Sequence, residues 1–224
     1  MMFFILIIGM MLVGGLVSGT LKSRMNEYGQ IPLESGLSGE EVAQKMLRDN
    51  GIYDVTVTSV EGTLTDHYDP TKKTVNLSPD VYNGRSVASA AIAAHECGHA
   101  VQHATAYSML GLRSALVPIV GVASTWVQWV LIAGILTVRV FPGLLIAGVV
   151  MFGVITLFSV ITLPVEFDAS RRGLAWLDRS NIMGPENHEK AKNALWWAAM
   201  TYVVAAISSI ATLLYYISIL NRRN

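Results

Sequence analysis

Charged residues are scarce in this sequence. Asp, Glu, Lys and Arg make up 14% of its 224 residues, against about a quarter in soluble proteins, and 52% of the residues are hydrophobic. A single cysteine, Cys97, excludes an intrachain disulfide. The 16 basic residues balance the 16 acidic residues, so no excess of positive charge points to a nucleic-acid partner. Low-complexity segments and internal repeats are also absent, which argues against disordered tails.

Four long apolar stretches account for the hydrophobic composition. They cover residues 2–19, 114–138, 140–163 and 195–220. A helix needs about 20 apolar residues to cross a lipid bilayer, and each stretch approaches or exceeds that length. Only a short turn with Pro and Gly separates the second stretch from the third, which predicts a tight helical hairpin. We therefore predict a predominantly α-helical, multi-pass cell-membrane protein with four transmembrane helices.

Residues 2–19 could instead form a secretory signal peptide, which would carry basic residues ahead of its apolar core. The first positive charges, Lys22 and Arg24, come after the apolar stretch. We therefore expect a retained membrane anchor whose N-terminal end lies outside the cell.

The distribution of Lys and Arg predicts how the chain is oriented. With four spans, residues 20–113 and 164–194 lie on one side of the membrane, and they hold all but three of the 16 Lys and Arg residues. The exceptions are Arg139, Arg222 and Arg223. Cytoplasmic segments are enriched in Lys and Arg, so both polar segments are predicted to be cytoplasmic. The two C-terminal arginines mildly oppose this orientation.

The first polar segment predicts a small α+β domain. Ser38 and Glu41 have the spacing of a capping box at the start of an amphipathic helix. Residues 54–78 alternate β-branched and polar residues between turn signals, which predicts two or three short antiparallel strands. Ser86 can cap the helix that follows.

That helix carries the stretch AAHECGHAVQ, residues 93–102. His95 and His99 lie one helical turn apart, so both imidazoles leave the same face about 6 Å apart along the axis. Two ring nitrogens at this spacing can bind one Zn²⁺ ion. Glu96 is offset by about 100° around the helix, where it can take a proton from an attacking water without binding the metal. The pattern predicts a catalytic zinc site.

The motif also has two simpler explanations. By chance, His-Glu-x-x-His would occur in well under ~1 in 50 chains of this length. The two histidines could also be solvated residues on a helix surface. However, neighbours such as Ala91 and Val101 are small and apolar, and imidazoles buried there would need partners. The capped helix and its apolar surroundings favour the metal site.

A catalytic zinc ion needs a third protein ligand and an open position for water. The metzincin pattern would place glycine at 102 and histidine at 105, where this sequence has Gln102 and Thr105. His103 lies about 12 Å along the helix axis from His95 and cannot reach the same ion. The third ligand is therefore expected elsewhere in the chain.

Glu166 is the best candidate for that ligand. It follows the third apolar stretch on the predicted cytoplasmic side, and Pro164 suits the start of a new helix. The gluzincin pattern likewise places its glutamate on a later helix. Alternatively, Glu166 is an N-terminal helix residue that the helix dipole favours. The weaker candidates are Glu34, Glu40, Glu41 and Asp80.

HECGH, followed by a membrane hairpin and then by EFDASRRGL, resembles the YugP-like family of membrane zinc metallopeptidases. LTDHYDP and NLSPDVYNGRS are also similar to that family, so the resemblance covers nearly the whole chain. The layout is similar to the HtpX and CAAX-protease group as well, where a glutamate in an E-x-x-x-D motif follows the hairpin. The resemblance implies one zinc ion bound by His95, His99 and Glu166, with Glu96 as the general base.

One position departs from the HtpX-type motif. Ser170 stands where that motif carries an aspartate, so any orienting role of the aspartate would fall to Ser170, Asp168 or another group. Residues 71–78 are placed to form an edge strand that an extended substrate could join. Cys97 is expected to be a buried small side chain, and Gly98 to allow close packing beneath the metal. The open candidates for an oxyanion donor are His67, Tyr68, Tyr82, Arg172 and His188.

These features predict an integral membrane zinc metalloendopeptidase with a small zincin-like domain of the gluzincin type. Zinc-activated water would hydrolyse peptide bonds in peptide or membrane-protein substrates. The alternative is a catalytically silent zinc-binding or scaffolding membrane protein, although a structural site is normally closed by four protein ligands. A transporter is disfavoured because the apolar stretches hold few polar residues beyond Gln128. The sequence gives no indication of the oligomeric state.

Overall fold

The structure is a computed structural model that describes the backbone of residues 2–221 and the side chains of residues 8–221. Arg222 and Arg223, which entered the predicted orientation, lie outside the described residues. The helices are α1 (Met2–Gly29), α2 (Gly39–Asp49), α3 (Pro79–Tyr82), α4 (Val87–Ala104), α5 (Ser108–Thr137), α6 (Pro142–Ser180) and α7 (Pro185–Asn221). The strands are β1 (Thr56–Ser59), β2 (His67–Asp69) and β3 (Thr74–Leu77).

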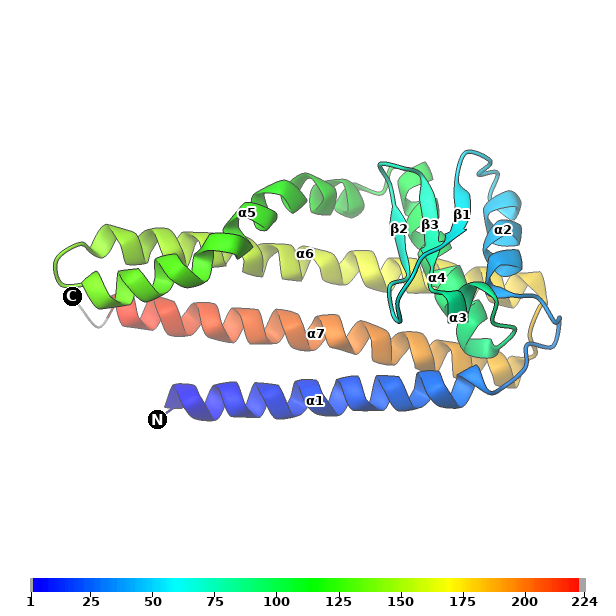
Figure 1. Ribbon diagram of the computed structural model, residues 1–224, viewed down its shortest axis with the longest axis horizontal. Helices are drawn as coiled ribbons and strands as arrows, with labels where there is room; N and C mark the ends of the chain where they lie inside the picture. Colours follow the sequence, from blue (N-terminus) through cyan, green and yellow to red (C-terminus); the bar gives the residue numbers. More distant parts are fainter. Residues whose placement is uncertain (1, 222–224) are drawn as a thin grey trace.

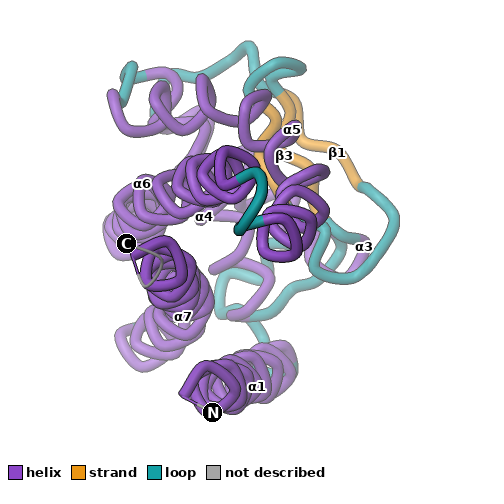
Figure 2. The backbone as a smooth tube through the Cα atoms, turned by 90° about the vertical axis from the view of Figure 1, so that its left-hand side faces the viewer, coloured by secondary structure: helices purple, strands orange, loops and turns teal. Residues whose placement is uncertain are grey.

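The molecule has a long helical part and a smaller mixed part at one end. Figure 1 shows α1, α6, α7 and much of α5 running along the long axis, while α2, α3, α4 and the sheet gather at one end. Figure 2, turned by 90°, shows α1 beside α7 and α4 beside α6, and both pairs are in contact. Both predicted polar segments therefore lie at the same end of the molecule.

Among the described residues, three helices, α5, α6 and α7, are long and apolar enough to cross a membrane. They expose large apolar side chains that suit lipid, among them Trp126, Trp129, Leu136 and Leu214. α1 contains the first predicted span, residues 2–19, but the side chains of residues 2–7 lie outside the described residues. A crossing by α1 stays a prediction.

The prediction that a new helix begins at Pro164 is wrong, because α6 continues from Pro142 to Ser180 with Pro164 inside it. Proline lacks an N–H and removes one helical hydrogen bond, but helices in a membrane tolerate it when neighbouring groups satisfy the backbone. The predicted last span, residues 195–220, lies within α7, which begins earlier, at Pro185. Glu166 therefore lies on the same helix as the third apolar stretch.

Local capping signals are confirmed. The Ser38 side chain accepts a hydrogen bond from the backbone of Glu41, whose carboxylate accepts one from the Ser38 N–H. The Ser86 side chain accepts from the Ser89 N–H at the start of α4. Both caps satisfy backbone donors that a helix start leaves unpaired.

The small sheet has the strand order β1-β3-β2. β2 and β3 pair antiparallel, as predicted, but β1 and β3 pair parallel, so the prediction was wrong for that pair. After β1 the chain crosses to the far edge of the sheet, forms β2 and then turns back to form β3 in the centre. In the turn between β2 and β3, the carboxylate of Asp69 accepts hydrogen bonds from the Thr71 and Lys72 N–H groups. β3 is therefore the central strand and β2 an edge, which corrects the assignment of residues 71–78 as an edge strand.

Two glycines let α4 and α6 approach closely. A Cβ on Gly98 of α4 would clash with the carbonyl oxygen of Ala169 in α6. A Cβ on Gly173 of α6 would lie 2.8 Å from the carbonyl oxygen of Ala94 in α4. The predicted role of Gly98 in close packing is confirmed, and the contact fixes how α4 lies against α6.

Gly98→Ala is expected to destabilise the protein by about 1–3 kcal/mol, because the added methyl group must push two helix backbones apart. Gly153→Ala is the matched control, since nothing lies within 4 Å of a Cβ at that position of α6. Thermal unfolding of the purified protein in detergent measures both changes. Equal unfolding temperatures for the two variants would contradict the close α4–α6 contact.

Candidate metal centre

Two histidines of α4 and one glutamate of α6 meet where the helices cross. Oε2 of Glu166 lies 3.3 Å from Nε2 of His95 and 3.7 Å from Nε2 of His99. One donor atom from each of the three residues lies within 4.8 Å of the others. Tetrahedral zinc ligands with bonds of 2.0–2.2 Å are roughly 3.4 Å apart, so this spacing suits one ion.

The donor set also fits a zinc ion chemically. Glu166 is 2% exposed, and its Oε2 is buried without a hydrogen-bond partner among the described residues. A buried carboxylate oxygen without a partner is costly, and a cation between it and the imidazoles would remove that cost. Two imidazoles and one carboxylate form a donor set that zinc commonly takes in catalytic sites.

The second nitrogen of each imidazole contacts a polar side chain. When Nε2 of each ring binds a metal ion, Nδ1 is the protonated nitrogen. Nδ1 of His95 then donates to the Ser170 hydroxyl at 3.0 Å, and Nδ1 of His99 donates to Oε1 of Gln102 at 3.0 Å. Such contacts fix the tautomer and the ring orientation.

Gln102 is itself held in one orientation. Its amide nitrogen donates to the Val165 carbonyl at 2.8 Å and to the Asp168 carboxylate at 2.9 Å, so its oxygen must face His99. Asp168 in turn accepts from Arg172 at 2.5 Å. The orienting role that the sequence left open thus divides between Ser170, which contacts one histidine directly, and Asp168, which acts through Gln102.

Ser170→Ala is expected to weaken zinc affinity by about 10–100-fold, because the His95 ring loses the group that orients it. The matched control is Ser159→Ala, whose hydroxyl donates only to the Ile155 carbonyl of its own helix. Competition with a chromogenic chelator measures both affinities. An unchanged affinity in Ser170→Ala would show that this hydroxyl does not support the site.

Glu96 lies beside these three residues and is 8% exposed. Burial raises the pKa of Glu96, the charges of His95 and His99 oppose the shift, and those of Glu166 and Asp66 add to it. A carboxylate whose pKa moves toward neutrality is a more effective proton acceptor at physiological pH. A buried carboxylate at this position can accept a proton from water and deliver it again.

A cavity of about 350 Å³ opens in front of these groups. Its walls include His67 and Tyr68 of β2, Arg113 of α5 and Tyr202 of α7. Of the five candidates for an oxyanion donor, only His67 and Tyr68 line it. The other three make contacts elsewhere: Tyr82 beside Glu40, Arg172 with Asp168, and His188 with the Leu174 carbonyl.

Sequence reasoning missed Gln102, Arg113 and Tyr202 as parts of the site. Nη2 of Arg113 lies 3.8 Å from Oε1 of Glu166, and its Nε is buried without a hydrogen-bond partner among the described residues. Gln102 could have been noticed as a glutamine about one turn after His99 in an alanine-rich helix. Arg113 and Tyr202 carry no local signal, because only the packing of α5 and α7 against α4 and α6 brings them here.

The remaining candidates lie away from the three residues. Nδ1 of His103 is 2.7 Å from the Tyr68 hydroxyl, outside the cavity. Glu34 accepts from the backbone of Gly184 and the side chain of Asn187, and Glu41 pairs with Arg85. Cys97 is fully buried, its thiol faces the Ala43 carbonyl, and burial raises its pKa, as expected of an inert small side chain.

Long apolar helices and a His–His–Glu donor set are features expected of a membrane zinc metallopeptidase, and sequence comparison points to the same class. Residues 3–221 match the family described as "Putative neutral zinc metallopeptidase", and the chain belongs to that family. It is 40% identical over 205 residues to the "Putative membrane protease YugP" of Bacillus subtilis (strain 168). The aligned region covers 91% of this chain and 90% of that protein. No solved structure matches the chain significantly.

Proposed function

We propose that this protein is an integral membrane zinc metalloendopeptidase of the gluzincin type. His95, His99 and Glu166 would bind the ion, and Glu96 would act as the general base. The observation that carries the proposal is the convergence of two Nε2 atoms on an unpartnered carboxylate oxygen, with Glu96 beside it and a cavity in front.

The residues of the site divide the chemistry between them. A bound zinc ion supplies Lewis-acid activation of the scissile carbonyl and of water. Glu96 takes the proton of the attacking water and then delivers it to the leaving amine, which needs a carboxyl group able to change its protonation state near neutral pH. His95 and His99 keep Nε2 available because Ser170 and Gln102 engage the opposite nitrogens.

β2 is the element suited to hold the substrate. It is an edge strand, so one side of its backbone is free of strand partners, and its residues His67 and Tyr68 line the cavity. An extended polypeptide can add to such an edge through backbone hydrogen bonds, which position the scissile bond without selecting its side chains. This role replaces the one first assigned to residues 71–78.

Arg113 is the best-placed donor for the developing oxyanion. It is a cation in the cavity wall, and its Nε has no hydrogen-bond partner among the described residues. Preorganised donors of this kind stabilise negative charge that appears only in the transition state. Tyr202, whose side chain lines the same cavity from α7, is the second candidate donor.

The proposal extends to the membrane topology. α1 would form the fourth span, and the end that holds the sheet and the metal centre would face the cytoplasm. The support is the position of both polar segments at one end of the molecule, together with their share of the Lys and Arg residues.

Metal removal tests the proposed function directly. The full-length protein in detergent should cleave internally quenched peptides, lose at least about 100-fold of that activity on treatment with a zinc chelator, and recover it when zinc is added back. Mass spectrometry of the products should show internal peptide bonds cleaved. A protein that holds one zinc ion per chain and yet cleaves no peptide would instead be the silent zinc-binding protein.

A further inference from the structure

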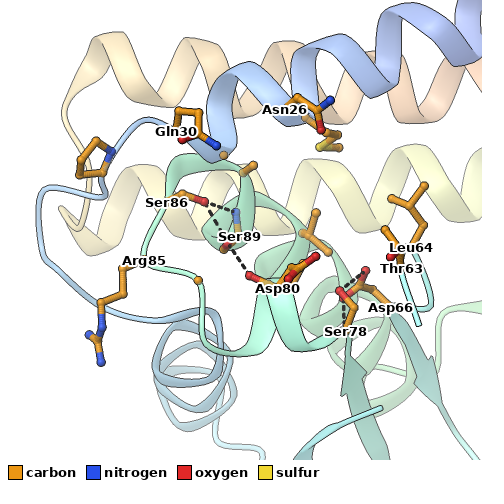
Figure 3. Close-up of a pocket in the computed structure, with 17 residues that line it drawn as sticks. Asn26, Gln30, Thr63, Leu64, Asp66, Ser78, Asp80, Arg85, Ser86 and Ser89 are labelled. Carbon is orange, nitrogen blue, oxygen red and sulfur yellow. Dashed lines mark hydrogen bonds between the residues drawn. The ribbon is translucent and has the colours of Figure 1, made fainter. Parts of the chain in front are cut away.

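A second, larger cavity lies between the end of α1 and the start of α4. Its volume is about 600 Å³. Figure 3 shows Asn26 of α1 and Gln30, just after α1, on one side, with Ser86, Ser89 and Asp80 facing them. Side-chain amides and hydroxyls of this kind can donate to and accept from a polypeptide backbone of any sequence. The metal centre does not use this cavity.

A third cavity, of about 310 Å³, lies between the larger cavity and the metal centre and shares lining residues with both. His95, Glu96 and Glu166 line the inner end of this connecting cavity. The residues that line both it and the larger cavity are Met25, Leu64, Asp66 and Ile92. Asp66 also lines the cavity in front of the metal centre, so this residue borders all three cavities. A polypeptide that lies across the metal centre can therefore continue toward α1.

The connecting cavity is mainly apolar. Leu21, Met25, Ile92 and Leu195 contribute to its wall. Leu64 stands where it meets the larger cavity, is 68% exposed and has a φ of 59°. An exposed leucine in the left-handed region is unfavourable by itself, and contact with an apolar substrate side chain would bury it.

The larger cavity carries two carboxylates without a countercharge. Asp66 accepts from the Ser78 N–H at 2.8 Å and from the Ser78 hydroxyl at 3.1 Å, but neither Asp66 nor Asp80 pairs with a Lys or Arg in the described part of the chain. Arg85 is the one cation that the described residues contribute to the wall, and Glu41 pairs with it at 2.9 Å outside the cavity. Figure 3 shows the Arg85 side chain directed away from both aspartates.

We propose that the connecting cavity and the larger cavity form the substrate subsites on one side of the scissile bond. The connecting cavity takes an apolar substrate side chain next to the cleaved bond. The larger cavity takes a Lys or Arg side chain farther along the same extended substrate, opposite Asp66 and Asp80. This inference rests on the proposed function, and it names the class of substrate: a polypeptide segment in which an apolar residue is followed on one side by a basic one.

Peptide series with a single varied position test the proposal. The probes are internally quenched peptides that carry Lys, Gln or Glu in turn at each position on either side of an apolar residue, cleaved by the full-length zinc-loaded protein. On one side of the apolar residue, the peptide with Lys should have a kcat/KM about fivefold to tenfold above that of the peptide with Glu, as expected for a partly screened charge pair. Higher ionic strength should reduce this ratio.

Asp80→Asn and Asp66→Asn should each lower the Lys-to-Glu ratio, and the double variant should bring it close to one. The amide oxygen that Asp66→Asn introduces can still accept from the Ser78 backbone, so the fold should persist. The matched control is Asp54→Asn, which removes an exposed carboxylate that pairs with Lys73 outside the cavity. The control should keep the ratio of the unaltered protein.

Binding of the same peptides, labelled for fluorescence anisotropy, to zinc-loaded Glu96→Gln gives a readout that needs no cleavage. A preference for Lys in binding without any cleavage by the unaltered protein would overturn the proposed function and leave the two cavities as a peptide-binding site that prefers a basic residue. Cleavage with equal preference for Lys, Gln and Glu would keep the proposed function and overturn the subsites. Neither cleavage nor binding would overturn both.

Discussion

Glu96→Gln is expected to lower kcat for peptide cleavage by about 10²–10⁴-fold while the protein keeps one zinc ion per chain. Glutamine has nearly the same shape as glutamate, but its amide cannot take a proton from water. Because Glu96 lies next to the three donor residues and is not one of them, the metal should remain. Steady-state cleavage of a quenched peptide and metal analysis of the same sample measure the two quantities.

The matched control for this change is Glu61→Gln, at an exposed position beyond β1. It should leave both activity and zinc content unchanged. If Glu96→Gln cleaved peptides at the rate of the unaltered protein, another group would have to be the base. Loss of zinc together with activity would instead make Glu96 part of the metal-binding set.

Glu166→Ala is expected to remove the zinc ion from the purified protein. Two imidazoles would remain, and the loss of a direct ligand should weaken affinity by more than the roughly 10–100-fold that follows from losing an orienting group. Metal content after gel filtration at sub-micromolar free zinc measures the effect. Activity should fall in parallel, because Glu96 alone cannot activate the carbonyl.

Two further alanine variants make this result specific. Glu34→Ala removes a carboxylate that bonds to Gly184 and Asn187, and His103→Ala removes an imidazole that bonds to Tyr68. Both should keep stoichiometric zinc. Should Glu166→Ala retain a full complement of metal, the third ligand would have to come from another residue.

Features encoded within one helix were predictable from the sequence. The capping box at Ser38 and the cap at Ser86 depend on neighbours three residues away, and the structure confirms both. The spacing of His95 and His99 likewise requires only helical geometry. The prediction of Glu166 as a ligand came from its place after the third apolar stretch and from a family resemblance. The structure brings Glu166 close to His95 and His99.

Features that depend on packing between distant elements were not predictable. Alternation of residues indicates a strand but not its partner, so the parallel pairing of β1 with β3 had no local signal. The reading of Pro164 as a helix start applied a rule for water-exposed helices to a helix that is largely apolar. Arg113 and Tyr202 join the site only because α5 and α7 pass beside the α4–α6 crossing.

The continuity of α6 has a consequence for how this protein would respond to bilayer thickness. An unbroken helix from Pro142 to Ser180 couples any tilt of its lipid-exposed half directly to Glu166. The contacts at Gly98 and Gly173 make α4 move with α6. Hydrophobic mismatch should therefore be absorbed elsewhere, for instance in α5, which contains Pro118 and which Figure 1 shows bent. Lipids of different acyl length should therefore alter how substrates reach the proposed metal centre and leave its zinc affinity unchanged.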